Sequence, residues 1–349
     1  ILAPTYVCDT LAHVMHPFVA RIHPSYRTAI FAWLVSRVAL WSAKCLAPGG
    51  LFNQSTPFPS FSTHGFERGA PAWSAVVHFS KAFDGLVPAA WGASGGEIVL
   101  AGLAELALLA ALIGVYRFAR RDNLPAVAER TTWLWACAPL MAWTVPVGSW
   151  SFGLAAVAIA LATAGGGLLI ASSVAISVAI LFRPEAVLLA PGLVYLGWTR
   201  RGSAPEPDWA PWALTFAPIV AFTAAVGSAI LLAGSYGVSL RTLQPDATWR
   251  HDFEWHGLEA HLPEVALAAG ALLLAVSAIK ELRKVHPSWA LMSIPCLAWP
   301  FLQEPSTAMM PALMLAIPAF GALSRVIDDA SRERVVLAAS LAGLVLFAL

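Results

Sequence analysis

The sequence has few charged residues. Asp, Glu, Lys and Arg together make up 12% of its 349 residues, whereas hydrophobic residues make up 58%. A soluble domain of this length does not have enough polar surface to cover so large an apolar fraction, so the bilayer is the expected solvent. The formal net charge is only +1. Because a nucleic-acid-binding face needs a concentrated basic surplus, we expect no nucleic acid partner.

Cysteine is also scarce, and no metal-binding spacing is present. The four cysteines are scattered, without a CxxC pair: Cys8, Cys45, Cys137 and Cys296. We expect them to be packing residues rather than a disulfide framework or a metal site. Three histidines, His251, His256 and His261, recur every five residues, which matches neither a helix face nor a strand face, and HExxH and HxH are absent. No metal and no cofactor are therefore predicted.

Positive charges are concentrated in short clusters between long apolar runs. They fall in every second gap, and with Arg21 and Arg27 these gaps hold 14 of the 21 Lys and Arg residues, against 5 in the opposite gaps. The clusters are Arg117, Arg120, Arg121 and Arg130; Arg200 and Arg201; Lys280, Arg283 and Lys284; and Arg325, Arg332 and Arg334. Lys and Arg favour the cytoplasmic loops of membrane proteins. We therefore expect a cytoplasmic N-terminus, with these clusters on the same side.

The apolar runs predict an all-α fold, a polytopic transmembrane bundle of about eleven helices in a single membrane domain, residues 1–349. The candidate spans are residues 29–47, 97–117, 131–148, 151–164, 166–183, 185–199, 210–235, 264–280, 288–302, 308–324 and 335–349. Several are near the lower limit of roughly 17 residues for a spanning helix. The three glycines at 165–167 predict either a tight turn or a kink. The first span can act as its own anchor, so no cleavable signal is needed.

Two gaps on the side opposite the basic clusters are long, residues 48–96 and 236–263. The first contains an amphipathic stretch around residues 71–83, which predicts a helix lying in the membrane interface. The second mixes Trp and Phe with charges, a pattern equally typical of an aromatic belt segment. Long loops on a rigid scaffold often carry functional sites. We expect these two loops to contact each other as a cap over the membrane domain.

A charged tripeptide, Arg183-Pro184-Glu185, interrupts an otherwise apolar run. Charges near a membrane face are costly unless they are paired or meet a polar cavity, which favours a functional role. The alternative is a simple helix break, in which Pro184 starts the next helix and both charges face interfacial water. Arg37 and Glu105 lie inside predicted helices and also need a partner or a cavity, and a pairing between them is possible.

Two carboxylates of the first long loop, Glu67 and Asp84, lie among aromatic residues. Aromatic walls and desolvation can raise the pKa of a carboxyl group towards neutrality, so either residue could act as a general base or bind a cation. The alternative for each of them is an ordinary solvated loop charge.

Several segments in order along the chain resemble one known family. They are FAWLVSRVALW (31–41), VYRFARR (115–121), WACAPLMAWTVPVGSWSFGLAAVAIAL (135–161), AISVAILFRPEAVLLAPGLVYL (175–196) and PALMLAIPAFGAL (311–323). They are similar to the GT-C membrane glycosyltransferases, in particular the mannosyltransferase II family of glycosylphosphatidylinositol synthesis and its bacterial relatives. The likeness extends over roughly two thirds of the chain.

This resemblance implies a GT-C architecture and transfer of a sugar, expected to be mannose, from a polyprenyl phosphate to an acceptor on the outer face. Such chemistry needs a base for the acceptor hydroxyl and cations for the donor phosphate. Glu67 or Asp84 would be the base, and Arg183, with Arg241 or Arg250, would bind the phosphate. The expected location is a bacterial inner membrane, as a multi-pass protein in contact with membrane lipids.

The chain departs from the family pattern at three places. The acidic residue that the family carries after a Trp in the first outer loop is here Glu67, after Phe66. The usual Tyr-Ser-Glu turn is replaced by residues 149–152, which have no carboxylate, and the Arg before the late span is replaced by residues 304–310. These losses leave open a catalytically inactive scaffold or accessory subunit with partner membrane subunits. A transporter is less favoured, because no matched pair of broken helices is seen in two halves.

Overall fold

A computed structural model describes residues 23–46, 71–86, 95–138, 141, 148–201, 206–235, 281, 286–302, 310–327 and 329–348. The elements in these residues are α3 (Pro24–Leu46), α4 (Pro71–Lys81), η2 (Asp84–Leu86), α5 (Gly95–Asp122), α6 (Pro125–Ala136), α8 (Gly148–Gly166), α9 (Leu169–Phe182), η4 (Pro184–Leu189), α10 (Ala190–Thr199), α11 (Ala210–Ser235), α13 (Pro287–Leu302), η8 (Met310–Leu315), α14 (Ile317–Val326) and α15 (Ala330–Ala348). All are α-helices or short 3-10 helices, and no strand occurs in this part of the chain, so the all-α prediction is confirmed there.

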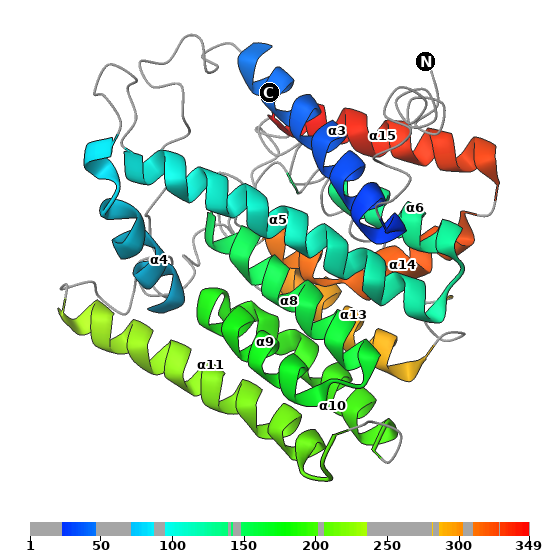
Figure 1. Ribbon diagram of the computed structural model, residues 1–349. Helices are drawn as coiled ribbons and strands as arrows, with labels where there is room; N and C mark the ends of the chain where they lie inside the picture. Colours follow the sequence, from blue (N-terminus) through cyan, green and yellow to red (C-terminus); the bar gives the residue numbers. More distant parts are fainter. Residues whose placement is uncertain are drawn as a thin grey trace, which may run out of the picture.

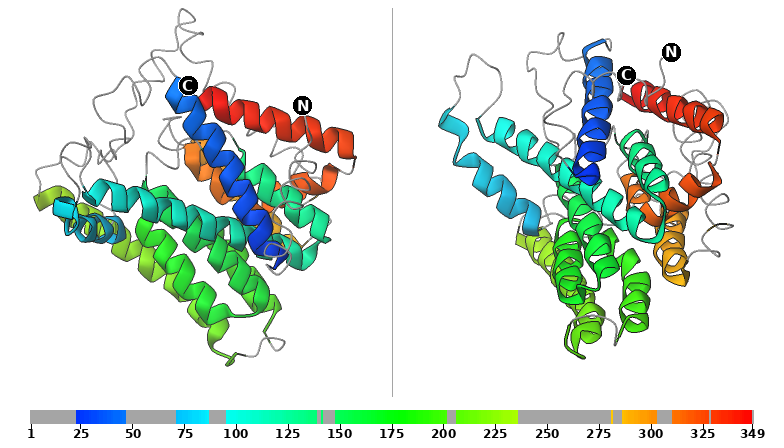
Figure 2. Two further views of the ribbon diagram at one scale, coloured as in Figure 1. Left: turned by 45° about the horizontal axis from the view of Figure 1, so that its top comes forward. Right: turned by 45° about the vertical axis from the view of Figure 1, so that its right-hand side comes forward.

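Four helices form one side of the molecule, with α5 against α8, α8 against α9, and α9 against α11 (Figure 1). Helices α3, α6, α14 and α15 lie on the other side of α5 (Figure 2). The contact between α5 and α8 is very close at Gly114, where a Cβ atom would fall 2.8 Å from the backbone carbon of Ala158. A residue without a side chain is therefore required for the two backbones to approach this closely.

The glycines at 165–167 form a tight turn rather than a kink. Helix α8 ends at Gly166, Gly167 adopts a positive φ of 81°, and α9 begins two residues later. The start of α9 is capped by Glu206, whose carboxylate accepts the backbone N–H groups of Leu169, at 2.6 Å, and Ile170, at 3.0 Å. This carboxylate satisfies donors that a helix start otherwise leaves without partners.

Two helices of the described residues are long and apolar enough to cross a membrane, Ile98–Asp122 and Ala210–Ser228. Three more apolar helices are shorter: Trp150–Gly166, Leu169–Phe182 and Pro287–Ala298. The predicted number of eleven spans therefore stays a prediction, and the candidate span at 264–280 lies outside the described residues. The candidate at 308–324 is wrong as a single helix. It consists of η8 followed by α14, and proline occupies the first turn of α14, where a helix starts more readily than it continues.

The basic clusters gather at one end of the helices. Arg325 donates hydrogen bonds to the Asp122 carbonyl, at 2.8 Å, and to the Asn123 side chain. Arg200 donates to the carbonyl of Ala164 at 3.1 Å, at the α8–α9 turn. We call this the basic end, and its arginines are Arg117, Arg120, Arg121, Arg130, Arg200, Arg201 and Arg325. The prediction that these clusters share a side is confirmed for these residues, and the cytoplasmic assignment stays a prediction.

Candidate functional site

The tripeptide Arg183-Pro184-Glu185 breaks the helix at the end opposite the basic end. Helix α9 ends at Phe182, and Arg183 is extended, with φ −145° and ψ 101°. Its backbone N–H still bonds to the Ala179 carbonyl at 2.7 Å, and Pro184 then opens the 3-10 helix η4. Proline has no N–H to continue the ladder of α9, so the break predicted at this position is confirmed.

The two charged side chains of this break are both buried, so the alternative in which they face interfacial water is wrong, and Arg183 lies against α8. Arg183 Nη2 is 3.3 Å from Glu185 Oε1, and only 5% and 7% of the two residues are exposed. The Arg183 guanidinium carbon lies 3.8 Å from the ring centroid of Trp150, in the first turn of α8. Such stacking contributes about 2 kcal/mol when the pair is desolvated. Because taking both charges from water costs several kcal/mol, the pair is weak evidence for a stabilising role.

Beside the Arg183 guanidinium, two polar atoms make no hydrogen bond in the described part of the chain. They are Glu185 Oε2 and the Trp150 indole Nε1. A buried donor or acceptor left in this state costs about 1–3 kcal/mol. One acceptor and one donor beside the guanidinium are therefore left without a hydrogen-bond partner among the described residues.

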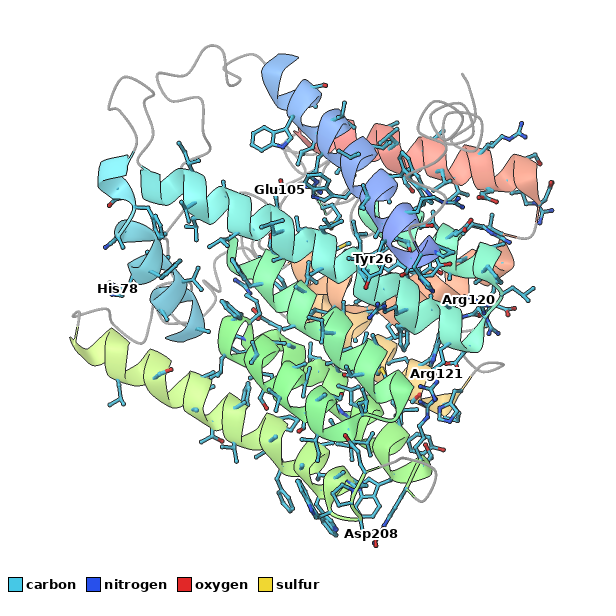
Figure 3. All side chains as sticks on the ribbon, viewed as in Figure 1. Tyr26, His78, Glu105, Arg120, Arg121 and Asp208 are labelled. Atoms are coloured by element: carbon cyan, nitrogen blue, oxygen red, sulfur yellow. The ribbon has the colours of Figure 1, made fainter. Side chains whose placement is uncertain are left out.

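The amphipathic helix α4 covers the end of α9 next to this site. Its Val76 and Val77 contact Phe182 and Leu100, while Phe182 also stacks on Phe152 at 5.2 Å. The other face of α4 is exposed; Figure 3 shows His78 on the outer side of α4. A helix is present at the predicted amphipathic stretch, and its inner face is apolar, but its outer face is mixed, since Phe79 is 58% exposed beside His78 and Lys81.

Asp84 lies at the same end, just before α5. Its side chain is exposed, and its Oδ1 accepts the backbone N–H of Gly96 at 3.1 Å. A Cβ at Gly96 would fall 2.3 Å from that oxygen, so the cap requires glycine there. The structure thus gives Asp84 a capping role at the start of α5. The role of Asp84 as a base stays a prediction.

The remaining predicted site residues lie outside the described residues. They are Glu67, Arg241 and Arg250. The predicted contact between the loops at 48–96 and 236–263 also falls there. Among the residues that the structure does describe, no group of three His, Cys, Asp or Glu is placed to hold a metal ion.

A second buried ion pair lies inside the helices. Arg37 Nη1 of α3 is 3.7 Å from Glu105 Oε1 of α5, so the pairing considered possible from sequence is present. Trp33 donates its indole N–H to Glu105 Oε2 at 3.0 Å. Glu105 is labelled in Figure 3.

Sequence reasoning missed the tryptophans of both pairs, Trp33 and Trp150. Trp33 lies one helical turn before Arg37, and this spacing was a usable signal. Trp150 is far from Arg183 in sequence, and no pattern links them.

No family model and no curated protein match the chain. Among solved structures, it is similar to the archaeal oligosaccharyltransferase AglB from Archaeoglobus fulgidus in complex with an inhibitory peptide and a dolichol-phosphate. The identity is 13% and the TM-score 0.49, over 93% of this chain and 55% of AglB.

Two crystal structures of the Archaeoglobus fulgidus oligosaccharyltransferase are also similar. The complex with Zn and sulfate gives 14% identity and a TM-score of 0.43, over 92% of this chain and 52% of that one. The apo form gives 13% and 0.45, over 91% and 52%. The chain thus spans about half the length of these proteins. At these TM-scores the similarity assigns neither a family nor an activity to the chain.

Proposed function

We propose that this chain is an integral membrane glycosyltransferase of GT-C type, which transfers a sugar from a polyprenyl phosphate to an acceptor on the outer side of the membrane. Mannose is the sugar that the sequence resemblance favours. The observation that carries the proposal is the buried Arg183–Glu185 pair, stacked on Trp150 where α9 breaks.

A charged break of this kind suits a phosphate site. In a bilayer, irregular backbone is tolerated where it is buried in protein or lines a cavity, and a charge there marks a functional site by default. The planar guanidinium of Arg183 can bind two phosphate oxygens at once. Glu185 neutralises Arg183 while the site is empty and releases it to the donor phosphate, because a carboxylate and a phosphate compete for the same N–H groups.

The other residues of the mechanism come from the outer loops. Glu67 or Asp84 removes the proton from the acceptor hydroxyl, so that its oxygen can attack the sugar carbon as the phosphate leaves. Arg241 or Arg250 adds positive charge beside Arg183. Asp84 is supported by its position, since the start of α5 and the end of α9 both contact α4.

The membrane orientation follows from the positive-inside rule. The basic end faces the cytoplasm, and the break at Arg183 lies near the opposite, outer face. A bacterial inner membrane, with a lipid-linked donor, is the location that this arrangement favours.

The second candidate is a catalytically inactive scaffold or accessory subunit. It is favoured by two contacts: Asp84 is used as a helix cap, and Arg183 already has Glu185 as partner. In this case the pair is a fixed part of the fold, and partner membrane subunits cover the outer face.

The decisive experiment compares membranes from cells that lack this chain with membranes complemented by the wild type or by Arg183→Lys. Lysine keeps the charge beside Glu185 but loses the planar fork and the stacking on Trp150. We expect transfer of labelled mannose from its polyprenyl phosphate to require the wild type and to fall about tenfold or more with Arg183→Lys, at equal membrane abundance.

Arg117→Lys is the matched control, because it makes the same change at the basic end and is expected to transfer sugar normally. Unchanged transfer in cells without the chain, together with loss of a partner subunit, would establish the scaffold instead.

A further inference from the structure

Three aromatic side chains form a continuous row at the basic end, across α10 and α11. Trp198 and Trp212 meet edge to face at 5.0 Å between ring centroids, and Trp212 stacks on Phe216 at 5.7 Å. Trp198 also donates its indole N–H to the Thr215 hydroxyl at 3.4 Å. Rings held against each other in this way keep a fixed orientation. We call Trp198, Trp212 and Phe216 the aromatic row.

The row continues into an exposed apolar stripe along α11. Trp212 is 47% and Phe216 54% exposed, and Ile219 and Val220, one turn further, are 57% and 66% exposed. Residues at this spacing share one face of a helix. The stripe therefore leads away from the basic end, as a surface for an extended hydrocarbon chain would.

Arginine side chains lie at the start of this aromatic row. The guanidinium carbon of Arg201 lies 5.4 Å from the ring centroid of Trp198. Arg200 donates to the carbonyl of Ala164 at 3.1 Å and to that of Gly165. Arg121 reaches the same turn, since its Cδ lies 3.3 Å from where a Cβ of Gly165 would be.

The two arginines at this turn repel each other. Burial, and then the charge of Arg121, lower the pKa of Arg200, while Asp122 acts in the opposite direction. An anion between the guanidinium groups would remove this repulsion.

Asp122, next to Arg121, acts against this repulsion, and the other carboxylates nearby are used elsewhere or point away. Glu206 is used by the backbone N–H groups at the start of α9. Asp208 is exposed where α11 begins, and Figure 3 shows it beyond the end of the helices, away from Arg121 on α5. Within the described ranges, neither carboxylate forms an ion pair with Arg121 or Arg201.

We propose that Arg121, Arg200 and Arg201, together with the aromatic row, form a binding site for one anionic phospholipid of the cytoplasmic leaflet. The arginines bind the headgroup phosphate, and an acyl chain lies along the row and the stripe of α11. Trp and Arg at the membrane boundary suit these two roles, because a Trp ring lies at the level of the lipid headgroups while an Arg cation binds the phosphate.

This site is independent of sugar transfer. It lies at the start of α9, whereas Arg183 follows the end of that 14-residue helix. At about 1.5 Å per residue the two sites are about 20 Å apart. Failure of either proposal therefore leaves the other standing.

The test is lipid binding by the purified full chain in zwitterionic nanodiscs, with phosphatidylglycerol and phosphatidylcholine as probes and native mass spectrometry as readout. We expect one phosphatidylglycerol to bind at least about tenfold more tightly than phosphatidylcholine. The double variant Arg121→Gln/Arg201→Gln should lose this preference. Both side chains are exposed, so the fold should persist, and an unchanged thermal midpoint verifies it.

The matched control is Arg117→Gln/Arg120→Gln, which removes two charges from the same helix end but away from the row. It should retain the preference, and an equal loss in both double variants would overturn the site in favour of general surface charge.

A further variant, Trp212→Ala/Phe216→Ala, separates the lipid from free phosphate. This variant should weaken phosphatidylglycerol binding. If inorganic phosphate displaced bound phosphatidylglycerol as effectively as added phosphatidylglycerol does, the aromatic row would have no role in binding.

Discussion

The molecule contains two buried arginine–glutamate pairs that differ in what they connect. Arg37 and Glu105 join α3 to α5, and Trp33 adds a hydrogen bond to the same carboxylate. Arg183 and Glu185 are two residues apart, on the two sides of one helix break. Both pairs carry the desolvation cost of buried charge. The Arg37–Glu105 pair joins two helices that are distant in sequence, whereas the Arg183–Glu185 pair is local.

The difference separates a structural tie from a binding group. If Arg37 changed its partner, α3 and α5 would lose the ion pair that joins them. If Arg183 exchanged Glu185 for a ligand, the ion pair lost would be one within a single helix break, and the aromatic face of Trp150 could stay under the guanidinium. A local pair is therefore suited to exchange its carboxylate for a ligand, and an interhelical pair is suited to fix the fold.

The largest expected effect is from Glu105→Ala, which leaves Arg37 buried without its countercharge. We expect the free energy of unfolding to fall by about 3–5 kcal/mol, seen as a lower thermal midpoint and lower membrane abundance. The double replacement Arg37→Met/Glu105→Leu removes both charges and should recover most of the loss. Equal damage in the single and double variants would show that shape, not charge, maintains this contact.

Two glycines provide the next comparison. Gly114→Ala forces a Cβ against the backbone of Ala158, which cannot move without parting α5 and α8, so we expect a cost of about 1–3 kcal/mol. At Gly153 a Cβ would meet Arg183 Cγ at 2.9 Å, and that side chain can shift. Thermal unfolding should show less damage from Gly153→Ala, while sugar transfer should fall. The opposite order would contradict the assignment of Arg183.

Replacements of Trp150 test the stacking under Arg183. Trp150→Phe keeps an aromatic face and removes an indole N–H that has no hydrogen-bond partner among the described residues, so the change in unfolding free energy should stay within about 1 kcal/mol. Trp150→Leu also removes the cation–π contact and should cost about 1–2 kcal/mol more. Chemical unfolding in detergent measures both, and equal losses would remove the role of the ring face.

The smallest effect concerns pH and lies far from both pairs. Asp329 accepts hydrogen bonds from the Ser331 hydroxyl, at 2.6 Å, and from the Ser331 backbone N–H, at 3.1 Å, at the start of α15. The hydrogen bond from the Ser331 side chain is the largest cause of a pKa of Asp329 below its ordinary value of 3.8.

Because the pKa of Asp329 is lower in the folded state, the ionised carboxylate stabilises the fold at pH values above the ordinary pKa of Asp. This stabilisation is lost as the pH falls through the lowered pKa. Amide exchange at 329–335 should therefore quicken, relative to Asp329→Asn, as the pH falls below about 4. An identical pH dependence in both proteins would contradict the cap.

The sequence predicts the parts of this structure that depend on local chemistry. Proline places the break at Arg183-Pro184-Glu185, and arginines mark the segments that share the basic end, because both signals act within a few residues. The helical turn between Trp33 and Arg37 is a local signal of the same kind, although no role of Trp33 is predicted from it.

Contacts between helices could not be predicted in this way. Helices α8 and α9 are apolar on nearly every side, so their sequences do not show which face meets which neighbour. The position of Trp150 under Arg183 depends on that choice. The error at 308–324 has a related cause, since hydropathy alone does not register that prolines divide an apolar run.

Binding of a polyprenyl phosphate without sugar tests the central claim most directly. The variant Arg183→Gln/Glu185→Gln removes the local pair without leaving a buried charge, and Arg37→Gln/Glu105→Gln does the same for the interhelical pair. Native mass spectrometry in nanodiscs should show binding about tenfold weaker for the first variant, whose thermal midpoint should fall only by the loss of the cation–π contact with Trp150. The second should bind normally at a lower midpoint. Wild-type affinity in Arg183→Gln/Glu185→Gln would contradict the account.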